Sequence, residues 1–130
     1  MFAVLQEKGY QAAIQLKEGK PSQIRSSING HKYNIYFFGV GETGRAKVIE
    51  FGYGVVLKEK IAAERISQWN RKFRFGRAYL DDDEDDPILE MDLNVERGCT
   101  SAMLDNTVDR WISVLDRFVN HINDSAAEPQ

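Results

Sequence analysis

The sequence has few of the residues that cross-link a chain, hold a metal or carry a protein across a membrane. Cys99 is the one cysteine among 130 residues, so no disulfide can form within the chain. The two histidines, His31 and His121, lie far apart without the spacing of metal ligands, and we expect both to face solvent. No apolar run is long enough to cross a bilayer, and the first residues do not resemble a signal peptide. We therefore expect a cytoplasmic protein with no membrane contact, no bound metal and no cofactor.

The chain also lacks an excess of charge of one sign. It carries 17 basic and 20 acidic residues, a formal net charge of −3, which argues against a protein that binds nucleic acid through bulk charge. A chain of 130 residues, 42% of them hydrophobic, suits one domain with one hydrophobic core. We expect residues 1–123 to form that domain and the small, polar residues 124–130 to form a flexible tail.

The spacing of the apolar residues predicts the order helix, four strands, helix, two strands, helix. The expected helices lie over residues 2–8, around 62–73 and from 100 or 101 to 122, and the expected strands over 10–17, 22–28, 32–38, 46–56, 75–81 and 88–95. Asn29-Gly30 between two of these strands is a strong hairpin signal. Runs of hairpin-linked strands predict an α+β domain, with an antiparallel sheet of five to six strands and helices packed on one face.

A glycine-rich segment, GVGETG at residues 39–44, has the glycine spacing of a dinucleotide-binding loop. Such a loop holds phosphate at the N-terminus of the helix that follows it, whereas the residues from Arg45 onward alternate as a strand does. A phosphate-binding loop would also have lysine in place of Arg45. We therefore predict a hairpin loop in which Gly39, Gly41 and Gly44 adopt positive φ angles.

Six consecutive acidic residues, 81–86, invite comparison with a calcium-binding loop. That loop needs glycine at its sixth position and glutamate at its twelfth, where this sequence has Asp86 and Asp92. The pattern therefore predicts a solvated hairpin tip, because aspartate favours turns. Weak binding of a divalent ion stays open as an alternative.

The strand predicted over residues 75–81 points to a charged and aromatic surface. Alternation places Arg77 and Tyr79 on the side of the sheet away from the helices. The register of the next strand then pairs Arg77 with either Glu90 or Asp92. Either pairing gives a cross-strand ion pair worth up to about 1 kcal/mol.

Two further aromatic residues, Tyr36 and Phe38, share this side of the sheet if the strand over residues 32–38 keeps the same phase. An uncovered sheet face that carries aromatic rings among paired charges is a candidate binding surface. The other interpretation is a polar outer face with scattered rings, and the sequence leaves both open.

Five short blocks occur together in this sequence: IRSSING at 24–30, YFFG at 36–39, SQWN at 67–70, RFGRAYLD at 74–81 and PILEMDLN at 87–94. With Trp111 in the closing helix, they resemble the YbjN family of bacterial proteins from Leu5 to Ile122. The resemblance implies a regulator of bacterial sensory transduction with a fold similar to type III secretion chaperones. It implies no established enzymatic activity, cofactor or catalytic residue. Family members often begin with a longer first helix, so a longer, exported precursor stays open.

The resemblance and the residues together predict a non-enzymatic protein-binding module, regulatory or chaperone-like. An unidentified protein partner would dock on the uncovered sheet face or at a sheet edge. The expected contacts are aromatic and basic side chains of that face: Tyr36, Phe38, Arg77 and Tyr79. Analogy with secretion chaperones adds a homodimer as an expectation. The alternative is a sensor of a small ligand or divalent metal that uses the 39–44 glycine loop or the 81–86 acidic loop.

Overall fold

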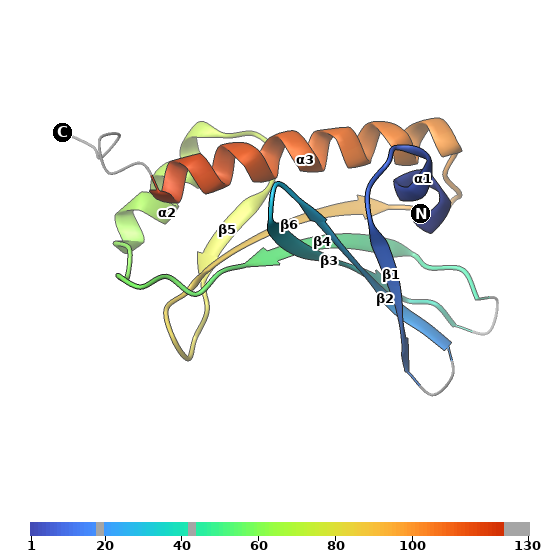
Figure 1. The fold of residues 1–130 in the computed structure, drawn as a ribbon, viewed down its shortest axis with the longest axis horizontal. Helices are drawn as coiled ribbons and strands as arrows, with labels where there is room; N and C mark the ends of the chain where they lie inside the picture. Colours follow the sequence, from blue (N-terminus) through green and yellow to red (C-terminus); the bar gives the residue numbers. More distant parts are fainter. Residues whose placement is uncertain (18–19, 42–43, 124–130) are drawn as a thin grey trace.

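A computed structural model of the protein describes residues 1–17, 20–41 and 44–123. Its elements follow the predicted order (Figure 1): α1 (Phe2–Glu7), β1 (Ala12–Lys17), β2 (Lys20–Ile28), β3 (His31–Phe38), β4 (Val48–Gly54), α2 (Ala63–Lys72), β5 (Arg77–Leu80), β6 (Pro87–Asn94) and α3 (Ser101–Asn123). The flexible tail predicted for residues 124–130 lies outside the described residues.

The six strands form one antiparallel sheet in the order β1-β2-β3-β4-β6-β5. All three helices lie on the same side of this sheet, with α3 running along its length (Figure 1). The predicted α+β fold with helices on one face is therefore confirmed. Of the helices in the described part of the chain, none combines the length and the apolar character that crossing a membrane requires.

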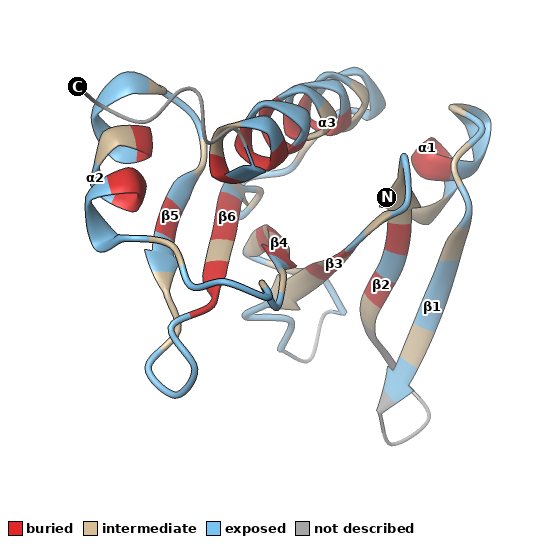
Figure 2. Cartoon of the chain, turned by 60° about the vertical axis from the view of Figure 1, so that its left-hand side comes forward, coloured by how far each residue is buried: buried red, intermediate tan, exposed pale blue. Residues whose placement is uncertain are grey.

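The core lies between the sheet and α3, as the alternation of apolar residues predicts. Buried and less buried positions alternate along β4 (Figure 2), where Phe51 and Tyr53 are both buried. The Trp111 ring of α3 lies 5.5 Å from the Phe51 ring, centroid to centroid. Phe118 meets Tyr53 edge to face at 6.4 Å. Tertiary packing of this kind, more than local propensity, stabilises an amphipathic helix.

Side chains of α2 bind the backbone of β5 and of Gly76, which precedes it, at one edge of the sheet. The Trp69 indole Nε1 donates a hydrogen bond to Gly76 O at 3.0 Å. Asn70 Nδ2 donates to Ala78 O at 2.9 Å, and Asn70 Oδ1 accepts from Ala78 N at 2.9 Å. Asn70 thus occupies backbone groups of an edge strand that would otherwise be free to pair with another strand.

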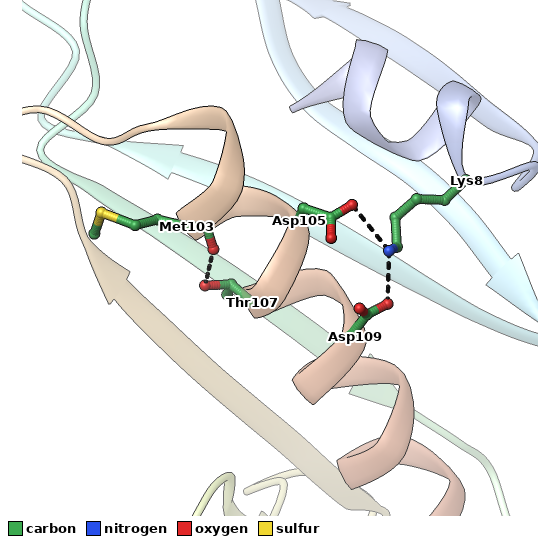
Figure 3. Close-up of polar contacts among 5 residues, drawn as sticks. All are labelled: Lys8, Met103, Asp105, Thr107 and Asp109. Atoms are coloured by element: carbon green, nitrogen blue, oxygen red, sulfur yellow. Dashed lines mark hydrogen bonds and ion pairs between the residues drawn. The ribbon is translucent and has the colours of Figure 1, made fainter.

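The short helix α1 is held against α3 by one lysine between two aspartates (Figure 3). Lys8 Nζ lies 2.9 Å from Asp105 Oδ1 and 2.7 Å from Asp109 Oδ1, one turn further along α3. Hydrogen bonds with Asp109 and then Asp105 raise the pKa of Lys8 to about 12. On the same helix, Thr107 Oγ1 donates to Met103 O at 2.8 Å.

Candidate functional site

The side of the sheet away from the helices, here called the open face, carries the four residues predicted to contact a partner. Tyr36 and Phe38 lie on β3 and alternate with residues that face the helices. Arg77 and Tyr79 do the same on β5. Phe38 is 49% exposed and Tyr79 is 41% exposed. The structure therefore places all four side chains on one surface, and their role in binding stays a prediction.

A shallow hollow of about 650 Å³ lies in the open face between β3 and β5. Its lining includes Tyr36, Gly52, Tyr79, Glu50 and Glu90. A Cβ atom added at Gly52 would lie 3.3 Å from Cε2 of Tyr36, so the tyrosine ring leans over the glycine backbone. The ring forms a wall of the hollow, and the glycine forms part of its floor.

Glu90 on β6 contacts both residues that β5 contributes to the open face. The register pairs Arg77 with Glu90, and Arg77 Nη2 donates to Glu90 Oε2 at 3.0 Å. The Tyr79 hydroxyl donates to Glu90 Oε1. Burial acts to raise the pKa of Glu90, but the hydrogen bonds from Tyr79 and Arg77 outweigh it and lower that pKa. Of the two registers that the sequence left open, the structure has the one with Glu90.

Glu50 on β4 belongs to the site, although the sequence analysis missed it. Its cross-strand partners are Tyr36 on β3 and Asp92 on β6. Burial, helped by the charge of Glu90 and by the nearby Asp92, raises the pKa of Glu50 to about 7. The alternation in β4 shows that Glu50 faces away from the core, but only the pairing of β4 with β6 brings the three carboxyl groups together.

The raised pKa of Glu50 predicts a pH-dependent gain in stability when its charge is removed. The folded state holds this proton more tightly than the unfolded chain, so Glu50 lowers the free energy of unfolding as pH rises from 4.5 to about 7. We expect Glu50→Gln to raise that free energy at about pH 8 by about 1 kcal/mol, a value reduced by solvent screening at this partly exposed site. At about pH 4.5 we expect little change.

Urea unfolding of the Glu50→Gln variant at both pH values measures this difference. Glu59→Gln, in the exposed segment before α2, is the matched control and should change stability little at either pH. An equal gain for Glu50→Gln at both pH values would mean that the substitution acts through packing and not through charge.

The glycine loop joins two strands, as predicted. β3 and β4 pair antiparallel on either side of it, and no helix follows it before β4. Gly39, Gly41 and Gly44 have φ angles of 68°, 57° and 73°, so the predicted positive values are confirmed. Residues 42–43 lie outside the described part of the chain. The loop therefore has the geometry of a hairpin connection and not that of a strand leading into a phosphate-binding helix.

The acidic run forms the hairpin between β5 and β6, where Asp81 N donates to Asp86 O at 2.9 Å. Residues 82–85 are exposed, as predicted for a hairpin tip. The prediction is wrong for Asp86, which is buried and whose Oδ1 lies 3.0 Å from Lys60 Nζ. Across the described residues, no set of three or more histidine, cysteine, aspartate or glutamate side chains is placed to hold a metal ion.

The prediction that both histidines face solvent is wrong. His121 is half-buried, with Nε2 2.7 Å from Arg65 O and its ring 5.7 Å from that of Trp69. His31 is half-buried as well, with its ring edge-on to that of Tyr53. These contacts join segments far apart in the chain, which residue periodicity does not reveal.

Comparison with protein families gives one match that covers nearly the whole chain. The YbjN model, described as "Putative bacterial sensory transduction regulator", matches residues 1–124. The chain belongs to the YbjN family. The fold is similar to the crystal structure of YbjN from E. coli, "a putative transcription regulator", with a TM-score of 0.65 and 15% sequence identity. That match covers 88% of this chain and 82% of the E. coli chain. Comparison with curated proteins gives no match.

The YbjN match confirms the resemblance that the five sequence blocks indicated. At 15% identity, the likeness to E. coli YbjN bears on the fold alone, and it agrees with the predicted α+β architecture. The YbjN family description names a regulator and no catalytic activity, which is consistent with a non-enzymatic regulatory role. The protein partner and the homodimer stay predictions.

Proposed function

We propose that this YbjN-family protein is a non-enzymatic regulatory or chaperone-like module that binds a segment of a protein partner on its open face. The observation that carries the proposal is a group of aromatic side chains on an uncovered sheet face, around a hollow. Phe38 and Tyr79 are exposed, and the rings of Tyr36 and Phe38 lie 6.3 Å apart. Aromatic and arginine side chains are the ones that contribute most binding energy at protein interfaces, and Arg77 lies on the same face.

The open face suits docking better than the β5 edge does. At that edge, Asn70 already bonds to both backbone groups of Ala78, so an added strand would have to displace it. The outer edge of β1 is the rival surface, because β1 ends the sheet and carries the exposed side chains of Ile14 and Leu16.

A photoreactive benzoylphenylalanine in place of Phe38 tests the proposal, because this side chain is similar in shape to the one it replaces. After irradiation in native lysate, we expect a crosslink to a specific protein that mass spectrometry identifies. The same photoreactive residue in place of Met103, which is 45% exposed on α3, is the matched control and should give no such crosslink. Crosslinks from position 103 alone would place the partner on the helical side and contradict the proposal.

The alternative, a sensor of a small ligand or a divalent ion, predicts a different result. A ligand that binds the folded state raises its melting temperature, so one nucleotide or metal ion should then give a specific shift of several degrees. A protein-binding module should show no such ligand-specific shift. Thermal denaturation with a panel of nucleotides, Ca²⁺ and Mg²⁺ distinguishes the two.

A further inference from the structure

The hollow in the open face is a trough with aromatic walls and a floor that is in part bare backbone. Tyr36 on β3 and Tyr79 on β5 lie on its two sides, with β4 and β6 between them. Gly52 and Gly54 of β4 line it without adding side chains. The walls stand on strands three spacings apart, roughly 14 Å. This width admits an extended chain or a long side chain from a partner.

The lining of this trough has two carboxyl groups, Glu50 and Glu90, and neither lysine nor arginine, while Asp92 lies beside it in the lining of a neighbouring hollow. Glu50 and Asp92 are cross-strand partners, and the charge of Glu90 acts on Glu50 as well. Arg77 pairs with Glu90, whereas Glu50 and Asp92 form no ion pair within the described residues. Burial together with this excess of negative charge raises the pKa of Glu50 to about 7. Three carboxyl groups thus face the single charge of Arg77, and the surroundings of the two aromatic rings carry a net negative charge once Glu50 is ionised.

We propose that the trough binds a lysine or arginine side chain from a basic segment of the protein partner. The inference rests on the proposed function, since it names the chemistry of the segment that docks on the open face. The carboxylate of Glu50 receives the positive charge, and its cross-strand partner Asp92 adds negative charge from beside the trough. The rings of Tyr36 and Tyr79 contact the alkyl stem and attract the cation through their π faces.

Charge complementarity selects this occupant over the others. An acidic segment would be repelled by the carboxylates of Glu50 and Asp92. A wholly apolar segment would remove the carboxylate of Glu50 from water without giving it a partner, which is unfavourable. A basic segment avoids both the charge repulsion and the cost of burying an unpaired carboxylate, because its long side chains have an apolar stem and a cationic end.

The other end of the open face has the opposite charge. Arg25 on β2 and Lys32 on β3 line a separate hollow there, beside Asn34. The basic residue of the partner is therefore expected over β4 and β6 and not over β2.

Proton release gives the proposal an independent signature. The titratable and charged groups that face Glu50 come from three strands: Tyr36, Glu90, Asp92, Arg77 and Tyr79. A cation beside Glu50 favours its ionised form, so binding at low pH must displace a proton that is already absent at high pH. The affinity for a basic segment should therefore rise with pH across neutrality.

Fluorescence polarisation with short, capped, labelled peptides tests the proposal on the intact protein. One peptide alternates lysine with serine, and the other alternates glutamine with serine. We expect the lysine peptide to bind at least about tenfold more tightly than the glutamine peptide at about pH 8. Its affinity should rise about fivefold between about pH 6 and about pH 8. Equal binding of the two peptides would overturn the proposal.

Two double variants separate the trough from general charge attraction. Glu50→Gln/Asp92→Asn should remove most of the preference for lysine and its pH dependence. Glu59→Gln/Asp82→Asn removes the same charge from exposed loops and should keep both. An equal loss in the two variants would overturn the proposal, because the attraction would then be diffuse. A partner crosslinked from position 38, with no preference for the lysine peptide, would refute the basic segment and leave docking on the open face standing.

Discussion

Gly76→Ala is expected to lower the free energy of unfolding by about 3 kcal/mol. Gly76 has a φ of 80°, where an L side chain is strained. An added Cβ would lie 2.8 Å from Cγ1 of Val114 and 3.0 Å from Cδ1 of Leu89. Both neighbours are buried, so neither can move away without disturbing the packing between β6 and α3. Backbone strain and atomic overlap therefore add.

Gly30→Ala is the matched control for this experiment. Gly30 has a φ of 82°, close to that of Gly76, but no heavy atom lies within 4 Å of the Cβ that alanine would add. The control therefore keeps the backbone strain without the overlap, and we expect a loss of about 1 kcal/mol. Urea unfolding measures both variants. A loss for Gly76→Ala no larger than that for Gly30→Ala would contradict the close packing of the segment before β5 against α3.

The features that could be predicted from the sequence are those that depend on a local pattern of residues, such as one apolar face of a helix or a two-residue turn. The helix predicted from residue 100 or 101 to 122 is an example. In α3, Val108, Trp111 and Leu115 are all buried, because a helix on one face of a sheet needs one apolar stripe. The Asn29-Gly30 turn is another, because its two positive φ angles, 52° and 82°, are those that this dipeptide favours in a tight hairpin.

Contacts between distant segments could not be predicted from these local patterns. Asp86 was expected to be solvated because aspartate favours turns, but it pairs with Lys60, 26 positions earlier in the chain. The Trp69-Asn70 pair was noted as part of a family block, but its hydrogen bonds depend on how α2 folds back along β5. The residues were visible in the sequence, and their partners were not.

The open face could be predicted in part, for the same reason. Alternation places Tyr79 away from the helices, and it places Tyr36 there as well if the strand over residues 32–38 keeps the same phase. The sheet order, however, inserts β6 between β4 and β5, and this brings Glu50 beside Asp92. No local pattern shows which strand is the neighbour of β4, so the acidic side of the trough appears only in the structure.

Tyr36→Ser/Phe38→Ser is expected to weaken capture of the protein partner by at least about tenfold. Both side chains lie on the open face, and serine removes the apolar surface that an interface would bury. Neither belongs to the buried core, so we expect the melting temperature to stay nearly unchanged and the free energy of unfolding to fall by no more than about 1 kcal/mol. A large loss of stability would instead mark them as part of the core.

Ile14→Ser/Leu16→Ser is the matched control for capture. It removes two other exposed apolar side chains, at the free edge of β1, which is the rival docking surface. The most direct test of docking on the open face is capture of the partner from native lysate. The wild-type protein and the two double variants are compared at equal concentrations of folded protein. Docking there predicts that Tyr36→Ser/Phe38→Ser loses the protein crosslinked from position 38 and that Ile14→Ser/Leu16→Ser retains it. Retention by the first variant together with loss by the second would move the interface to the β1 edge and contradict the proposed function of the open face.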